Sequence, residues 1–537
     1  MNKIDRRKFL QYSSSVLASA SMPAFWVPRV ANSDSGAGRK KLVIFFMNGG
    51  NDGQNTIVPI RTYDDVGTEI NDFAGDWLAQ WNPNNGDFPP FTGPNSHSQY
   101  DHYRALRRDI HLRKVAEGSH TPILPLNVWS GGPALGNRMP MSGYVSSGFV
   151  EFGMNPAMQA LVDIWDAGDL AIFPAAHCGP DPNRSHFFQT EYFGHGLYNT
   201  TEGEYEYGDG RGWVGRYFDQ KYLPGGIVPD RIEAFDFEGG YFPLMDGSIP
   251  ILAVSNPASV LNTSEENLLS DVIGINQARA ADPNTLQGEF ALTQQALFDK
   301  LAKLDGVTFP NNTDDYNNAN PGLHPYPNST LGRNFMRAAA MIKDPIVGAE
   351  IEVINLDRGS FDTHGNQVEA SNTGSGSHAN TLGDCANSIK AFYEDVNAAG
   401  CGDDVITLVM SEFGRTADEN GNRGTDHAHA SCFFAIGNSV NPGLYGNWPG
   451  TADRIPDAAN PGEFISDLNG ANSSGGGRKW LNESVDYRDI LSELIGYHLN
   501  DPASSGIDAA QPFNATGNSE VYTLPLTRLG FVGTSHS

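Results

Sequence analysis

Two short motifs in the C-terminal half combine residue types that bind metal ions. Phe361-Asp-Thr-His364 places a carboxylate and an imidazole two residues apart, and Thr425-Asp-His427 places another such pair side by side. In an extended turn, the Asp-x-His spacing brings both side chains to one side, where they can share a cation. Between these motifs, Glu412 and Arg415 directly follow an apolar run. Together these residues predict a site for a divalent metal.

The elements that must position these motifs are buried strands. Residues 405–410 form a β-branched apolar run that is typical of a strand in a parallel sheet. Residues 41–47 and 351–356 have the same character, and Asp52 and Asp362 follow them. Because ligands bind beyond the carboxyl ends of parallel strands, we expect these side chains to meet at one edge of the sheet.

A further candidate segment follows the strand expected at 170–174. It contains Arg184, Ser185 and His186 at the start of an expected helix. A serine at a helix N-terminus lies at the positive end of the helix dipole, which suits an anion or a nucleophile that attacks an anionic ester. In the alternative interpretation, Asn183 or Ser185 is an ordinary helix cap, and Arg184 and His186 only orient the loop. The residues leave both interpretations open.

The alternation of strands and helices predicts the fold class. Expected helices at 155–168, 331–342 and 378–396 alternate with the strands, as in a doubly wound sheet. We therefore predict a three-layer α/β fold in which a mostly parallel central sheet is flanked by helices. The predicted organisation is a single domain over 41–510, with a loop-rich insertion at about 61–150, a candidate cap at about 225–325 and a peripheral tail at 511–537.

Charge and the N-terminal segment limit the partners and the location. Lysine and arginine total 35 against 63 acidic residues, giving a net charge of -28, which argues against nucleic acid and anionic membrane surfaces. Asp5-Arg-Arg-Lys-Phe-Leu10 is similar to the twin-arginine export motif. We read residues 1–31 as a signal segment for the twin-arginine export machinery, and we expect a periplasmic or secreted protein. The later sequence has no long apolar run, so we expect no stable membrane insertion after processing.

The motifs together resemble a known family. Asn48-Gly-Gly-Asn-Asp-Gly53, Asn183-Arg-Ser-His-Phe187 and Ser411-Glu-Phe-Gly-Arg-Thr416, with the two metal motifs, look like the bacterial exported family of domain of unknown function 1501. The resemblance covers about residues 41–500 apart from 61–98. It implies an alkaline phosphatase-like and sulfatase-like superfamily fold, with one or two divalent metals, such as Zn, Mn or Ca, at the site.

The resemblance also implies a set of metal ligands. By position, the residues similar to superfamily ligands are Asp52, Asp362, His364, Glu412, Asp426 and His427. Ser-Glu-Phe-Gly stands where phosphatases and sulfatases usually show Ser-Asp-His-Gly. Phe413 therefore replaces an imidazole, which puts a second metal in question.

The nucleophile has three candidates: Ser185 by position, then Thr56, and otherwise a metal-bound water. Cys178-Gly-Pro180 is similar to the start of the sulfatase signature, but Pro182 stands where an arginine is required. We therefore do not predict a formylglycine sulfatase.

From these residues and the resemblance we expect an exported, metal-dependent hydrolase of phosphate or sulfate esters. Its substrate would be a small or polymer-linked anionic ester. The catalytic candidates are Ser185 and the neighbouring His186, with Arg184 or Arg415 to balance developing negative charge. The alternative is a non-catalytic binding or assembly protein of the cell envelope that keeps the same fold.

Overall fold

The structure is a computed structural model. It describes residues 39–72, 98–118, 120–127, 137–141, 148–177, 184–196, 210–222, 231–237, 243–249, 251–257, 296–297, 299–449, 455–456, 464–465, 481, 483–499, 509, 511–513 and 528–533. The expected signal segment at 1–31 lies outside the described residues, as do parts of the expected cap and of the tail.

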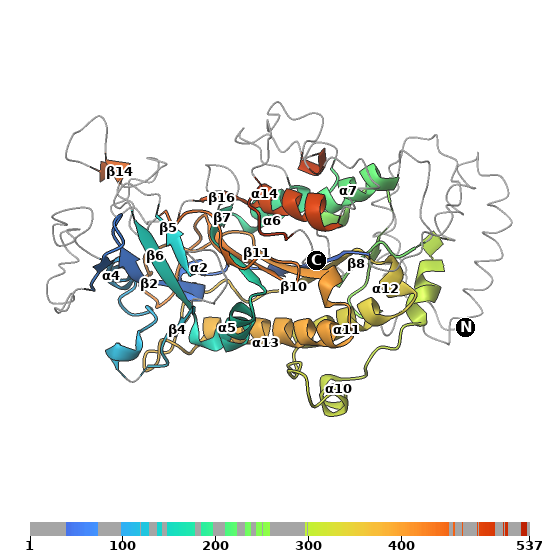
Figure 1. The fold of residues 1–537 in the computed structure, drawn as a ribbon, viewed down its shortest axis with the longest axis horizontal. Helices are drawn as coiled ribbons and strands as arrows, with labels where there is room; N and C mark the ends of the chain where they lie inside the picture. Colours follow the sequence, from blue (N-terminus) through green and yellow to red (C-terminus); the bar gives the residue numbers. More distant parts are fainter. Residues whose placement is uncertain are drawn as a thin grey trace, which may run out of the picture.

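A nine-stranded sheet forms the centre of the described structure (Figure 1). Its middle strand β1 (Lys41–Met47) runs parallel to β10 (Val353–Arg358) on one side and to β11 (Val405–Ser411) on the other. All seven residues of β1 are buried, as expected for a strand that is covered on both faces. The predicted α/β class, with a mostly parallel central sheet, is confirmed.

One central strand runs in the opposite direction. β12 (Ser431–Ile436) is antiparallel to β11 and also to β7 (Leu170–His177). Two reversals leave β7 parallel to β11, so both end at the same edge of the sheet. The full order is β13 (Gly443–Leu444), β7, β12, β11, β1, β10, β8 (Ala234–Asp236) and β9 (Leu252–Ala253), and β16 (Val485–Asp486) also pairs with β7.

Helices cover both faces of this sheet (Figure 1). Alternate β1 side chains point to opposite faces, so Val43 and Phe45 belong to one hydrophobic core and Leu42 and Ile44 to the other. The helices of the first face are α5 (Gln159–Ala167), α11 (Thr330–Lys343) and α13 (Ser377–Ala398). Those of the second face are α6 (His186–His195), α7 (Trp213–Tyr222) and α14 (Tyr487–Leu494). Two shorter helices are α10 (Thr313–Ala319) and α12 (Val347–Glu350).

A second, antiparallel sheet is built mainly from the segment expected as an insertion. The short helix α2 (Gly53–Thr56) leads from β1 into it. Tyr100 and Tyr103 of α4 (Gln99–Leu106) share a small buried cluster with Val58. The strands are β2 (Ile57–Tyr63), β3 (Glu69–Ile70), β4 (Leu124–Pro125), β5 (Arg138–Pro140) and β6 (Phe149–Met154). This sheet positions Arg107, which follows α4.

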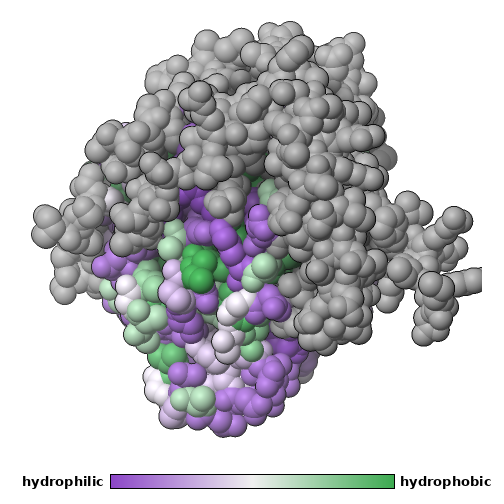
Figure 2. Space-filling model, turned by 90° about the vertical axis from the view of Figure 1, so that its right-hand side faces the viewer, coloured by the Kyte–Doolittle hydropathy of each residue, from purple (hydrophilic) through white to green (hydrophobic). Residues whose placement is uncertain are grey.

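The surface of the described part mixes polar and apolar side chains. On the face in Figure 2, hydrophilic and hydrophobic groups are interspersed among the coloured residues. The large exposed apolar side chains are Val66, Val115, Phe187, Ile346 and Tyr497, and single exposed apolar residues are common on protein surfaces. None of the described helices combines the length and the apolar composition that a membrane span requires.

A buried histidine near the start of β1 gives a testable pH dependence. His498 lies in a π-helical turn (Ile495–Leu499), with Nε2 3.0 Å from the Lys41 carbonyl oxygen. Burial lowers the pKa of His498 from 6.5 to about 4. Between these values the unfolded chain binds a proton that the folded chain does not. We therefore expect the free energy of unfolding to fall from pH 6.5 to 4, by roughly 3 kcal/mol from this residue.

Urea unfolding at a series of pH values checks this expectation. His498→Gln keeps an N–H donor and removes the titration, so it should reduce the pH slope by one proton. The remaining slope belongs in part to His378, whose pKa burial also lowers to about 4. A variant with the wild-type slope would contradict the assignment.

Candidate metal centre

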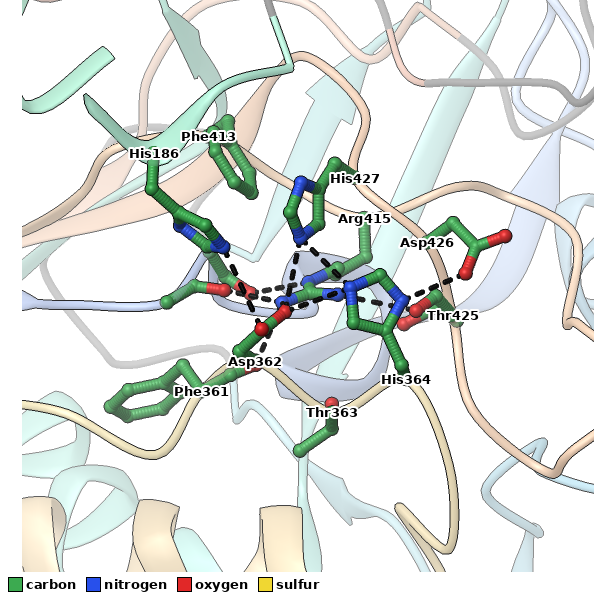
Figure 3. A network of polar contacts seen from close by, with 12 residues as sticks. His186, Phe361, Asp362, Thr363, His364, Phe413, Arg415, Thr425, Asp426 and His427 are labelled. Atoms are coloured by element: carbon green, nitrogen blue, oxygen red, sulfur yellow. Dashed lines mark hydrogen bonds and ion pairs between the residues drawn. The ribbon is translucent and has the colours of Figure 1, made fainter. Parts of the chain in front are cut away.

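Three imidazoles surround the carboxylate of Asp362 (Figure 3). The Nε2 atoms of His364 and His427 each lie 3.0 Å from Asp362 Oδ1, and Nε2 of His186 lies 3.6 Å from Oδ2. The Nε2 atoms of His364 and His427 are 2.9 Å apart. Ligands at about 2.0–2.1 Å from a tetrahedral metal are about 3.3–3.4 Å from one another. The spacing of the side chains therefore fits one cation between them.

The rings come from three different parts of the fold. His186 begins α6, Asp362 and His364 lie in the loop after β10, and His427 lies in the loop between β11 and β12. Ligand atoms of His186, Asp362 and His427 all lie within 4.8 Å of one another, so within the described residues these three form a group that could hold a metal ion.

Each imidazole has an acceptor behind it. The Nδ1 contacts are His186 to Glu412 Oε1 at 2.6 Å, His364 to Asp426 Oδ1 at 2.8 Å, and His427 to the Arg184 carbonyl oxygen at 2.8 Å. An acceptor at Nδ1 places the ring proton there, so the Nε2 lone pair faces the centre. The facing Nε2 atoms of His364 and His427 then have no proton to share. A cation between them, or one added proton, would stabilise this close approach.

Metal ligands bind in their deprotonated forms, and the pKa values at the centre favour these forms for Asp362 and His427. Partial burial opposes ionisation of Asp362, but the hydrogen bond and positive charge of Arg415 lower its pKa to about 2. Burial lowers the pKa of His427, so this ring is neutral at pH 7. The hydrogen bond with Glu412 raises the pKa of His186, so a proton competes with a metal at this ring more than at His427.

Glu412 was expected as a ligand, but the structure places it behind one. Its buried carboxylate accepts hydrogen bonds from the Gly49 amide at 2.6 Å, from Nδ1 of His186 at 2.6 Å and from the Thr190 hydroxyl at 2.8 Å. Asp426 has the equivalent position behind His364, and it also accepts from Asn420 at 3.1 Å. Both acids orient imidazoles, as outer carboxylates do at metal sites.

Asp52, also expected as a ligand, belongs to a separate buried network. Its Oδ2 lies 2.6 Å from Arg107 Nη1 and 2.5 Å from Gln367 Nε2. The reason is the turn after β1, where Gly49 and Gly50 have φ of 116° and 77°. A Cβ on Gly49 would lie 2.6 Å from the Asp362 amide nitrogen, so only glycine permits this approach. The loop presents backbone to the centre, and Asp52 points elsewhere.

Arg415 was expected to balance charge on a substrate, but its guanidinium donates hydrogen bonds to other groups of the protein. It is buried and donates to Asp362 Oδ1 at 2.5 Å. Its other hydrogen bonds go to four carbonyl oxygens, those of Gly49, Gly50, Phe361 and Thr425. Arg415 therefore fastens three loops together and holds Asp362 among them.

The nucleophile candidates differ in their surroundings. Ser185 caps α6 next to His186, without a side-chain capping hydrogen bond, and the neighbouring Arg184 is exposed. Thr56 is buried, and its hydroxyl donates to the Asp52 carbonyl at 2.8 Å. Because Thr56 is buried and no base among the described residues accepts its hydroxyl proton, it is a poor candidate for the nucleophile. Cys178 and Asn183 lie outside the described residues.

Backbone strain is concentrated around the same loops. Across the described ranges, the non-glycine residues with positive φ are Ser360 (81°), Asn366 (51°) and Arg423 (55°). Ser360 lies two residues before Asp362, Asn366 two after His364, and Arg423 four before His427. Such conformations cost energy and are often retained at functional sites. Their position supports a functional role for the ligand loops.

Sequence reasoning missed several residues of the site. Phe413 was noted only as a missing imidazole, but its ring packs 5.0 Å from the His186 ring and 4.6 Å from the His427 ring, as an apolar wall. His186 and Thr190 both reach Glu412. Their spacing of four residues on a helix was the signal that they share a face.

Comparison with known proteins adds the family. A family model described as a protein of unknown function (DUF1501) matches residues 184–470, just over half of the chain. The match includes His186, Asp362, His364 and His427 and begins well after Asp52. A search of curated proteins gave no match.

Proposed function

The chain belongs to the DUF1501 family of proteins of unknown function, and we propose that it is a metal-dependent hydrolase of phosphate or sulfate esters. The observation that carries the proposal is the set of three Nε2 atoms directed at Asp362, each with its Nδ1 held by an acceptor. This is the arrangement of imidazole ligands at protein metal sites.

The ligand types favour Zn²⁺ or Mn²⁺ over Ca²⁺, because calcium takes oxygen ligands. One metal is favoured over two. Asp52 is engaged by Arg107 and Gln367, and Glu412 by His186, Gly49 and Thr190, so neither carboxylate remains for a second ion.

The role of His364 decides between a catalytic and a structural site. If His186, Asp362 and His427 are the protein ligands, a fourth position stays open for water or substrate, as catalytic zinc sites require. His364, supported by Asp426, is then the group that accepts and returns a proton at Nε2. If His364 is a fourth ligand, the site is closed and structural.

For catalysis, a divalent metal would lower the pKa of a bound water or alcohol and polarise the ester. The protein supplies the remaining functions. Ser185 is a nucleophile candidate beside His186, at the positive end of α6. Arg184 is exposed next to Ser185 and is the candidate for contact with an anionic substrate. Residues 5–10, which are similar to the twin-arginine export motif, are consistent with a reaction in the periplasm or outside the cell.

A specific observation favours a second candidate, a non-catalytic envelope protein. Arg415 lies 2.5 Å from Asp362 and neutralises this carboxylate without a metal. Elemental analysis of the purified protein and a panel of phosphate and sulfate esters separate the candidates. Bound metal with chelator-sensitive turnover supports the hydrolase, and absence of both supports the second candidate.

His364→Ala then tests the role of this ring. If His364 transfers protons, the variant should keep its metal and lose turnover by about 10²–10⁴-fold, the usual contribution of general acid–base catalysis. Loss of the metal itself would instead identify a closed structural site.

A further inference from the structure

A buried glutamine connects the two loops that carry the ligands. Gln367 Oε1 accepts hydrogen bonds from the hydroxyls of Thr363 at 3.0 Å and Thr425 at 3.1 Å. Thr363 lies between Asp362 and His364, and Thr425 precedes Asp426 and His427. One amide oxygen therefore holds both loops at a common point, within a fully buried environment.

The side-chain nitrogen of Gln367 is held by a separate buried network. Gln367 Nε2 donates to Asp52 Oδ2 at 2.5 Å, and Asp52 is paired with the buried Arg107. A carboxylate only accepts, so this contact fixes the orientation of the amide and leaves its oxygen for the two threonines. The backbone N–H of Gln367 also donates to the Arg423 carbonyl at 2.9 Å, so the backbone of Gln367 is fixed as well.

We propose that Gln367 is a positioning residue that sets the separation of Asp362 and His427 and thereby the metal affinity of the centre. The inference rests on the proposed metal-binding function. An amide suits this position because it accepts two hydroxyl protons and donates to a carboxylate. Glutamate would face Asp52 with like charge, and an apolar side chain would leave Thr363 and Thr425 without their shared acceptor.

Gln367→Met tests the proposal, because methionine has a similar volume and makes none of these hydrogen bonds. We expect its Kd for Zn²⁺, measured by competition with a chromophoric chelator, to rise about 10–100-fold, as for other residues that support metal ligands. Gln54→Met is the matched control. Gln54 is also buried, and neither of its amide atoms has a hydrogen-bond partner in the described structure, so its Zn²⁺ affinity should equal that of the wild type.

A double variant, Thr363→Val with Thr425→Val, separates positioning from general damage. It should weaken Zn²⁺ binding to a similar degree, and adding Gln367→Met should have little further effect, because the three residues act through one set of contacts. Fully additive losses, or wild-type affinity in folded Gln367→Met, would overturn the proposal.

A crystal structure of Gln367→Met keeps the inference testable without metal binding. If the wild type binds no Zn²⁺, the proposed function fails, but the distance between Asp362 Oδ1 and His427 Nε2 still decides the positioning role. A widened or reordered pair supports it, and an unchanged separation refutes it.

Discussion

Asp362→Asn should reduce Zn²⁺ affinity by more than about 100-fold, which exceeds the usual effect of losing a supporting residue. Asp362 is the only carboxylate directed at all three imidazoles among the described residues, and its pKa of about 2 keeps it ionised. Asparagine removes the charge and keeps an oxygen that can accept from Arg415. The fold should therefore survive while the ligand is lost.

Two matched Asp→Asn variants provide reference Zn²⁺ affinities for this prediction. Asp426→Asn changes the acid behind His364 and should weaken Zn²⁺ binding by about 10–100-fold. Asp357→Asn changes a partly buried acid five residues before Asp362, in β10, and should bind Zn²⁺ like the wild type. Isothermal titration of all three proteins provides the comparison. Equal affinities for Asp362→Asn and Asp357→Asn would remove Asp362 from the centre.

The sequence predicted which motifs meet, because strand ends carry that information. β10 and β11 flank β1 in parallel, so the segments that follow them begin at one edge of the sheet. Asp362, His364 and His427 come together for this reason. His186 joins them because β7 also ends at that edge, although an antiparallel strand, β12, lies between β7 and β11. β12 was not predicted from the sequence.

The direction of individual side chains could not be predicted in the same way. Asp52 follows β1, where a metal ligand was expected, but the Gly49–Gly50 turn directs its side chain to Arg107, which is 55 residues away in the sequence. Arg107 is placed by α4 and the second sheet, in a segment for which the sequence predicted a loop-rich insertion with a short helix near residues 100–108 and no sheet. Glu412 similarly faces α6 and not Asp362. Local pattern fixes where a residue lies along a strand, and long-range packing decides what its side chain contacts.

The largest loss of stability should follow Arg107→Met. The Arg107 side chain is fully buried and donates to Asp52, to Asn55 and to the carbonyls of Thr416 and Ala417. Burial alone would raise the pKa of Asp52, and Arg107 is the main cause that lowers it instead. Without Arg107, a buried carboxylate remains unpaired, and we expect a cost of about 3–5 kcal/mol in the free energy of unfolding.

Urea unfolding of Arg107→Met beside Arg61→Met provides the measurement. Arg61 also forms an ion pair, with Glu151, but its side chain is 56% exposed, and exposed pairs contribute at most about 1 kcal/mol. The double variant Arg107→Met with Asp52→Asn should recover part of the loss, because it removes the unpaired charge as well. Equal losses for Arg107→Met and Arg61→Met would show that Asp52 finds another partner or a proton. In that case the Asp52 network could not serve as the rigid anchor on which Gln367 and the ligand loops depend.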